Sequence, residues 1–316
     1  MKRILVTGGL GTVGAGLVME LRERGHHVVS LDLQHSHDEI GFSLRTDVLE
    51  PLYVRCDIAE YRQLERVFNL MGPFDFVYNC AAEFGRWNGE DHYEKVWSSN
   101  AIGLKNLLRL QEKIKFKLVH FSSSEVYGDW PNIMLESVMD EYEVRQMNDY
   151  AISKWSNEMQ VANSISQFAT ETVIVRLFNT YGPGEYYSPY RSVNCRFIYC
   201  AIKNIPWVVF KGHSRTSTYL SDTVNALSNI TNNFISGEVY NIGGHELHTI
   251  EQLSDLVINI TGADKNLVEY RESEILTTKN KVVDVNKSIK DLGYKSSVNL
   301  EEGISKTVEW MKKTYI

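Results

Sequence analysis

The chain has 316 residues, enough for one large domain or two modest ones with an ample core. Its 43% hydrophobic and 23% charged residues are ordinary for a globular protein, and a net charge of −7 argues against nucleic acid or an anionic membrane as a partner. No stretch approaches the roughly 18 apolar residues of a membrane helix, and the first apolar run is too short for a signal peptide. The four cysteines show no metal-ligand spacing, so we expect reduced thiols, no metal site and a cytoplasmic location.

The N-terminal segment has the pattern of a phosphate-binding turn. The apolar run Ile4–Val6 predicts a buried strand, and residues 7–14 follow it with the sequence TGGLGTVG. Gly8 permits a tight turn, Gly11 lets the backbone approach a pyrophosphate, and Gly14 lets the next helix pack close to the strand. The spacing therefore predicts that phosphate groups bind at the N-terminus of the following helix.

An acidic residue follows the second predicted strand. A helix is expected from Thr12 to Arg24, and it stops at Gly25. The next strand, His27–Leu31, leads directly to Asp32. A carboxylate at this point can accept hydrogen bonds from both hydroxyls of an adenosine ribose and would repel a 2′-phosphate, which favours NAD over NADP.

The first half of the chain alternates predicted strands and helices after a polar stretch at His35–Glu50. This alternation indicates an α/β fold, a Rossmann-like doubly wound parallel sheet with helices on both faces. Ligands of such sheets bind outside the carboxyl ends of the strands. The further predicted strands are Leu52–Cys56, Phe76–Asn79, Lys117–Ser122 and Thr172–Phe178, and the helices are Tyr61–Leu70, Asp91–Lys113 and Asn148–Phe168.

The pattern changes after Thr180, where prolines and tyrosines replace the regular alternation. We expect an NAD-binding domain over residues 1–180 and a smaller, irregular substrate-binding lobe over residues 181–316. Residues 238–242 could form a strand that returns to the sheet. A return segment near residues 216–245 would interleave the two domains.

Tyr150 and Lys154 are candidates for proton transfer. A spacing of four places both side chains on one face of a predicted helix. A nearby ammonium favours the phenolate and would lower the tyrosine pKa from about 10, so that Tyr150 could accept a proton from a substrate hydroxyl. Tyr199 and Lys203 repeat the Y-x-x-x-K pattern far from the strand ends, and we interpret that second copy as a chance match.

A serine run ends the strand that precedes this helix. Residues 121–128 read FSSSEVYG, so Ser123 lies at the carboxyl end of the predicted strand. A hydroxyl at this position can hydrogen-bond the same substrate oxygen that Tyr150 deprotonates. Serine is also a common turn former, and the order of the two motifs favours the functional interpretation.

With these motifs in place, the chain resembles the extended short-chain dehydrogenases/reductases of the nucleotide-sugar epimerase/dehydratase family. The matching pieces occur in family order over nearly the whole length. They are Thr7–Gly14, Asp32, Asp57-Ile58, Asn79–Ala82, Asn100, Ser122–Gly128, Tyr150–Lys154, Arg176–Gly182, Arg215 with Asp222, and Tyr240–Gly243.

The resemblance implies NAD as cofactor, a nucleotide-diphosphate sugar as substrate, and a homodimer formed through the helices at 91–113 and 148–168. The implied cofactor-binding residues are Gly8, Gly11, Thr12, Val13, Gly14, Asp32, Asp57, Ile58, Ala81, Ala82, Asn100, Tyr150 and Lys154. The implied catalytic residues are Tyr150, Lys154, Ser123, Ser124 and Glu125. The implied substrate contacts are Glu83, Arg86, Asn179, Arg191, Arg215 and Asn241.

Family members oxidise a sugar hydroxyl, usually at C4, and then differ in the next step. Glu125 resembles the glutamate of dehydratases and decarboxylases, and as a base at C5 it would lead to loss of the C6 hydroxyl. We therefore expect a 4,6-dehydratase first. The Ser124-Glu125 pair departs from the Asp-Glu of dTDP-glucose dehydratases, which keeps decarboxylation of a uronate open, with Arg86 or Arg215 holding the substrate carboxylate.

Two further alternatives remain open from the sequence. One is a 4-epimerase, which needs no base at C5. The other is a catalytically silent NAD-binding regulatory protein, against which the intact Ser123, Tyr150 and Lys154 argue. The segment Glu83–Trp87 departs from the standard family patterns, so we also expect an unusual sugar.

Overall fold

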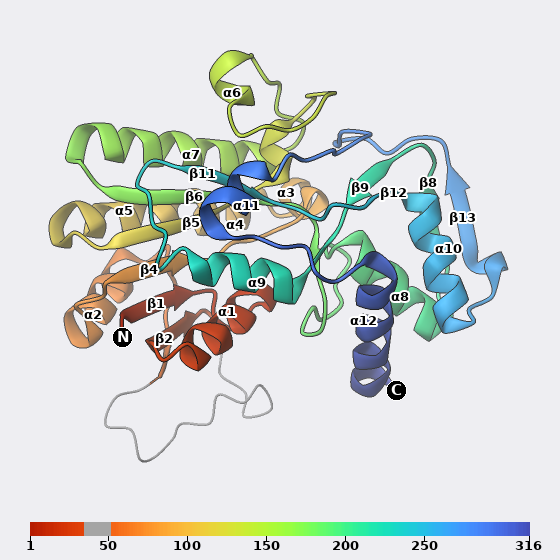
Figure 1. Ribbon diagram of the computed structural model, residues 1–316, viewed down its shortest axis with the longest axis horizontal. Coiled ribbons are helices and arrows are strands. Elements are labelled where there is room, and N and C mark those ends of the chain that lie inside the picture. The colour runs from red at the N-terminus through yellow and green to blue at the C-terminus, as the bar shows by residue number, and fades with distance from the viewer. Residues whose placement is uncertain (35–51) are drawn as a thin grey trace.

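The computed structural model describes residues 1–34 and 52–316, so the predicted polar stretch His35–Glu50 lies outside the described residues. Its central feature is a parallel sheet of seven strands in the order β11-β6-β5-β4-β1-β2-β3 (Figure 1). These strands are β1 (Arg3–Thr7), β2 (His27–Asp32), β3 (Tyr53–Arg55), β4 (Phe76–Asn79), β5 (Lys117–Ser123), β6 (Glu171–Leu177) and β11 (Val239–Ile242).

Helices cover both faces of this sheet, as apolar side chains on both faces of its strands require. One face packs against α1 (Thr12–Glu23), α9 (Leu220–Asn229) and α11 (Asn286–Leu292). The other packs against α2 (Tyr61–Met71), α5 (Gly103–Ile114) and α7 (Asp149–Phe168). The predicted Rossmann-like α/β class is confirmed. The chain reverses its direction of winding between β1 and β4, and ligands of such folds bind at this point.

A second cluster of elements has its own apolar core beside the carboxyl edge of the sheet. Its helices are α8 (Val193–Lys203), α10 (Ile250–Thr261) and α12 (Leu300–Tyr315). Short strand pairs join them: β8 (Trp207–Phe210) with β13 (Val268–Arg271), β9 (Ser214–Thr216) with β12 (Leu247–Thr249), and β7 (Thr180–Tyr181) with β10 (Thr218–Tyr219). A separate short helix, α6 (Val138–Glu141), projects from the body of the molecule (Figure 1).

The two parts interleave. The chain leaves the sheet after β6, builds β8 and β9, and returns through α9 to add β11 in parallel beside β6. The predicted return strand therefore forms, whereas the domain boundary at residue 180 stays a prediction. Within residues 1–34 and 52–316, no helix combines the length and the apolar character needed to cross a bilayer.

The predicted helix at residues 91–113 has a different local structure. A separate helix, α3 (Arg86–Asp91), precedes α4 (Tyr93–Trp97), and a π-helical turn at Ser98–Ile102 joins α4 to α5. His92 departs from helical geometry between α3 and α4, with φ −138° and ψ 50°. The π turn contains Asn100, which is buried.

Candidate active site

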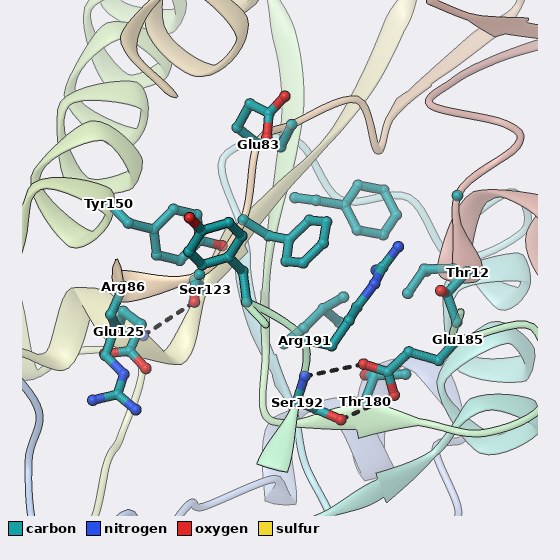
Figure 2. Close-up of a pocket in the computed structure, with 18 of the residues that line it drawn as sticks. Thr12, Glu83, Arg86, Ser123, Glu125, Tyr150, Thr180, Glu185, Arg191 and Ser192 are labelled. Atoms are coloured by element: carbon teal, nitrogen blue, oxygen red, sulfur yellow. Dashed lines mark hydrogen bonds between the residues drawn. The ribbon is translucent and has the colours of Figure 1, made fainter. Parts of the chain in front are cut away.

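A cavity of about 560 Å³ opens at the carboxyl edge of the sheet, within the size range of small-molecule sites. It extends from the glycine-rich turn after β1 to the start of α7 and on to β8 and β9. Figure 2 shows Tyr150, Ser123 and Glu125 on one side of it, and Thr12, Glu185 and Arg191 on the other. Most of the predicted site residues line this one cavity.

The glycine-rich turn fits a pyrophosphate. Gly8 has φ +66°, and a Cβ there would lie 2.6 Å from the Ala81 nitrogen. A Cβ on Gly14 would lie 2.1 Å from the Gly8 oxygen, so only glycine allows this approach of α1. Gly11 caps α1 without a capping side chain, and the first turn, with Thr12 and Val13 against the cavity, carries no acidic residue. The helix N-terminus is thus ready for an anion.

The predicted ribose and adenine contacts lie along the same wall. One Asp32 oxygen accepts from the Leu10 nitrogen at 3.0 Å and the other from the Gln34 nitrogen at 3.1 Å, which fixes the carboxylate at the end of β2. Asp57 and Ile58 line the cavity after β3. The Asn106 amide donates to the Ile58 carbonyl at 3.0 Å and holds this loop from α5.

Ala81 and Ala82 border the cavity after β4, while Asn100 lies just behind it. The Asn100 side chain accepts from the Glu83 nitrogen at 2.9 Å and donates to the Glu83 oxygen at 3.1 Å and to Ser153 Oγ at 3.0 Å. Asn100 is therefore a positioning residue that fixes Glu83 relative to α7. The Glu83 carboxylate accepts from the Asn88 amide at 3.0 Å.

Tyr150 and Ser123 come together as predicted from their motifs. Tyr150 lies in the first turn of α7, which Asn148 caps by accepting from the Ala151 nitrogen at 2.7 Å. The Tyr150 phenol lies beside the Ser123 side chain at the end of β5 (Figure 2), and both side chains are buried against the cavity. Ser123 Oγ also accepts from the Glu125 nitrogen at 3.2 Å, so its orientation is fixed.

The expected effect of Lys154 on Tyr150 is wrong for this structure. Burial raises the pKa of Tyr150 to about 12; the hydrogen bond from Ser123 opposes this rise, and the charge of Glu125 adds to it. The Lys154 ammonium points elsewhere, donating to the Phe121 oxygen at 2.8 Å, and lies 6.0 Å from the Tyr150 ring centre. Burial disfavours the charged form of both side chains, and it lowers the pKa of Lys154 to about 8.

Glu125 has a partner that sequence reasoning missed. Its carboxylate forms an ion pair with Lys281, which is only 1% exposed and arrives from the segment between β13 and α11. Burial alone would raise the pKa of Glu125, but Lys281, Arg86 and Arg215 together hold it well below its usual range. Ser124 is buried beside them and also lines the cavity.

The two arginines predicted to hold a substrate anion differ in their partners. Arg86 donates from Nη2 to both oxygens of Glu274 at 3.1 Å. Arg215 is 6% exposed and donates only to uncharged oxygens, those of Ser214 and Lys279 at 2.7 Å and of Thr277 at 3.0 Å. Burial lowers the pKa of Arg215 to about 10, which still leaves it charged at neutral pH.

Two further predicted substrate residues line the cavity, and a third does not. Asn179 donates to the Thr216 oxygen at 3.0 Å, and the Arg191 guanidinium lies 4.1 Å from the Phe84 ring centre. Asn241 is completely buried in β11, where its amide donates to Met134 and Asp284 and accepts from Tyr127. The expectation of a substrate contact at Asn241 is therefore wrong, because its amide holds the interior together.

Glu185 is a second site residue that carried no signal in the sequence. It is 4% exposed, lines the cavity beside Thr12, and accepts hydrogen bonds from the nitrogen and hydroxyl of Ser192 at 3.1 and 2.9 Å (Figure 2). Burial raises the pKa of Glu185 to about 6, although Arg191 and Ser192 act in the opposite direction.

The second Y-x-x-x-K copy is structural. Tyr199 stacks on Tyr187 with ring centres 3.7 Å apart, and Lys203 donates to the Tyr315 oxygen at 2.6 Å. Neither side chain lines the cavity. Among residues 1–34 and 52–316, no group of three or more His, Cys, Asp or Glu is suited to hold a metal ion.

A dinucleotide-binding turn and a Ser-Tyr-Lys set in one cleft define a short-chain dehydrogenase/reductase site. A model of the NAD dependent epimerase/dehydratase family matches residues 4–243, and the chain belongs to this family. NAD is its cofactor.

Relatives of known activity cover nearly the whole chain. It is 30% identical to UDP-glucuronic acid decarboxylase 1 of Xenopus tropicalis, over 99% of this chain and 72% of the relative. It is 26% identical to dTDP-glucose 4,6-dehydratase of Salmonella typhimurium, over 98% of this chain and 92% of the relative. The structure of UDP-glucose 4-epimerase with UDP-glucose from Thermotoga maritima superimposes on this chain with a TM-score of 0.85 at 27% identity. The superposition covers 99% of this chain and 100% of that structure's chain.

Proposed function

We propose that the protein decarboxylates a nucleotide-diphosphate uronic acid after oxidation of its C4 hydroxyl. NAD, when bound at the turn after β1, supplies the acceptor for the C4 hydride and returns that hydride at the end of the reaction. The chain's own groups bind the sugar, move its protons and hold its carboxylate. The proposal rests on the charges at the substrate end of the cavity.

The observation that carries the proposal is the unpaired charge of Arg215. Glu125 is engaged by Lys281, and Glu274 is engaged by Arg86. Among the parts of the chain that the structure describes, no carboxylate lies within ion-pair distance of Arg215, which is buried against the cavity. A buried charge of this kind is costly unless an anion accompanies it, and a uronate carboxylate supplies one.

Proton transfer would begin at Tyr150. As the phenolate, Tyr150 accepts the proton of the C4 hydroxyl beside Ser123, and Lys154 anchors the same helix face through its hydrogen bond to the Phe121 oxygen. The resulting C4 ketone lies β to the carboxylate. The C5–C6 bond then breaks, CO₂ leaves, and the electron pair of that bond becomes the C4 enolate.

The enolate needs a proton at C5 before the C4 hydride returns. Lys281 is a buried ammonium whose pKa is lowered from its usual range, with burial as the main cause. Such a group gives up a proton more readily than an exposed lysine. We assign the proton to the pair: Glu125 lines the cavity, and the Lys281 ammonium behind it is the proton source for Glu125.

A 4,6-dehydratase, which the sequence favoured, ranks second. Its supporting observation is the position of Glu125, whose backbone nitrogen is bonded to Ser123 beside Tyr150. Abstraction of the C5 proton would need a carboxylate of substantial basicity. The ion pair with Lys281 and the low pKa of Glu125 make it a weak base.

The test is product analysis. The protein is incubated with NAD and with UDP-, dTDP- and GDP-linked glucose and glucuronic acid, and products are identified by mass spectrometry. We expect a uronate to lose the mass of CO₂ while the amount of NAD stays constant. Loss of water from a neutral sugar would establish the dehydratase instead. An unchanged mass would leave the 4-epimerase and the regulatory protein, and only the 4-epimerase should give transient NADH absorbance near 340 nm.

We also propose a homodimer. Apolar side chains are exposed along the helices expected to pair, at Tyr93, Ile102, Ile152 and Met159, each between 43% and 51% exposed. A second copy of the same surface would cover them, as isologous contacts do.

A further inference from the structure

A segment without helix or strand crosses the substrate end of the cavity. Residues 272–284, which we call the strap, connect β13 to α11 and contain only isolated bridges at Asn280 and Val283. A segment of this kind has no ladder of its own, so its course depends on contacts with its surroundings. The strap carries Lys281, the partner of Glu125.

Backbone hydrogen bonds fix the strap around Lys281, whose nitrogen donates to the Ser214 oxygen at 3.1 Å, and side chains from three elements hold the part before it. Asn148, at the start of α7, donates to the Leu276 oxygen at 3.0 Å. Arg215 of β9 donates to the Lys279 oxygen at 2.7 Å. The third contact is charged: Arg86 of α3 donates to both oxygens of Glu274, with side chains 19% and 13% exposed. This ion pair lies at the beginning of the strap.

The helix that carries Arg86 is itself fixed against Tyr150. A Cβ on Gly89 of α3 would lie 2.8 Å from the Tyr150 nitrogen, so α3 packs directly against the first turn of α7. Glu90 accepts from the Asp149 nitrogen at 3.2 Å in the same contact. The ion pair therefore connects the helix turn that holds the proton acceptor with the strap that holds Lys281.

We propose that Arg86 and Glu274 form a latch that holds the beginning of the strap against α3 and thereby supports the position of Lys281 beside Glu125. Both are positioning residues for the decarboxylation proposed above, on which this inference rests. Arg86 is then not a substrate ligand, because its charge is already matched within the protein. The left-handed backbone of Leu276, with φ +62°, constrains the path between Glu274 and Lys281 further.

A charge exchange tests the latch. Arg86→Glu and Glu274→Arg are made singly and together, and kcat, KM and the NAD dissociation constant are measured with the nucleotide sugar that the wild type converts. Each single variant should lose about tenfold or more in kcat, and the double variant should recover to within about threefold of wild type, because the ion pair is restored with its charges reversed. NAD affinity should stay within about twofold throughout, which shows that the variants fold.

Two outcomes contradict the latch: a double variant no better than the worse single variant, or a Glu274→Arg variant with wild-type kcat. Either result would return Arg86 to the role of substrate ligand. The control is the exchange of Lys211 and Glu272, an ion pair at the start of the same strap whose side chains are 49% and 85% exposed. That exchange should leave kcat unchanged.

A readout without turnover separates this inference from the proposed function. Thermolysin cuts before large apolar residues, and the strap offers Ile275 and Leu276. We expect faster cleavage there in both single variants and the wild-type rate in the double variant, whichever product the enzyme makes. Equal rates in all four proteins would contradict the latch, whereas a different wild-type product would contradict only the decarboxylation.

Discussion

The Lys154 ammonium lies 6.0 Å from the ring centre of Tyr150 and donates its hydrogen bond to the backbone of β5 instead of to the phenol. The two side chains share a helix face, yet the phenol lies beside Ser123, which acts to lower its pKa. Lys154 therefore makes no hydrogen bond to the phenol and instead anchors α7 to β5. Because burial holds the pKa of Tyr150 at about 12, the free protein keeps this tyrosine protonated at neutral pH.

Replacing Tyr150 by Phe should remove the proton acceptor and leave the cleft intact. We expect turnover to fall by about 10³-fold, as for the loss of other general bases, while NAD affinity changes by less than about twofold. Product mass spectrometry and calorimetric titration with NAD measure the two effects. Tyr199→Phe, in the second Y-x-x-x-K copy, is the control and should retain full turnover. Activity within tenfold of wild type in Tyr150→Phe would refute the assignment.

Asp32 should set the preference for NAD over NADP. Asp32→Ala removes the acceptor expected to bind both ribose hydroxyls, so NAD affinity should fall by about tenfold or more, while NADP affinity should fall less or rise. Dissociation constants for both dinucleotides measure the change. Asp57→Ala, on the same wall, is the comparison and should weaken both cofactors alike. An equal loss for both cofactors in Asp32→Ala would remove the specificity argument.

Arg215 should distinguish uronates from neutral sugars. In Arg215→Met, we expect KM for the uronate to rise by about tenfold or more, with little change in binding of the corresponding neutral nucleotide sugar. Arg215→Lys keeps the charge without the planar fork and should give an intermediate KM. Steady-state kinetics and competition titrations provide the values. Equal weakening for both sugars would reassign Arg215 to the diphosphate.

Glu185 should make stability depend on pH. Its pKa rises from 4.5 to about 6 on folding, so the folded state binds the proton more tightly than the unfolded chain does. The stability contributed by protonated Glu185 is present below about pH 4.5 and is lost as the pH rises through about 6. Glu185→Gln cannot ionise and should be more stable than wild type by about 2 kcal/mol at neutral pH.

Urea unfolding of both proteins measures this difference. Near pH 4.5 the two free energies of unfolding should nearly coincide, and the gap should open toward about pH 7.5. A gap that is constant over this range would show that Glu185 does not titrate there.

Met159 should report on the proposed dimer. It is 51% exposed on α7, and Met159→Glu places a charge on the surface that a second copy would cover. Sedimentation equilibrium should show a dimer for wild type and a largely monomeric variant, since an unpaired charge in an apolar interface is costly. Lys312→Glu, on α12 away from that surface, should not alter the mass. A monomeric wild type would contradict the dimer.

The fold could be predicted closely because its signals are local. The apolar run Phe76–Asn79 forms a strand with those bounds, and Asn148 caps α7 as the residue before the helix. The glycine-rich turn and Asp32 were also recognisable, since each acts through backbone geometry or the end of a strand. Such features depend on few residues that are neighbours in the chain.

The features that could not be predicted from the sequence depend on contacts between segments that are distant in the chain. Lys281 reaches Glu125 across 156 positions from a strap with no motif, so no local pattern predicts the ion pair. The buried position of Asn241 and the low dielectric around Tyr150 likewise follow from packing, and both overturned expectations drawn from spacing or resemblance. The helix predicted at residues 91–113 begins two residues later, after the break at His92, and contains the π turn at Ser98–Ile102, which no local pattern indicated.

The return of β11 to the sheet has a consequence for protein engineering. A fragment ending at residue 180 would leave the outer edge of β6 unpaired and would uncover the apolar face of α1 that α9 protects. Exposed strand edges of this kind promote aggregation. The cofactor-binding half should therefore not fold as a separate fragment. A change of sugar specificity calls for the exchange of loops within the full chain.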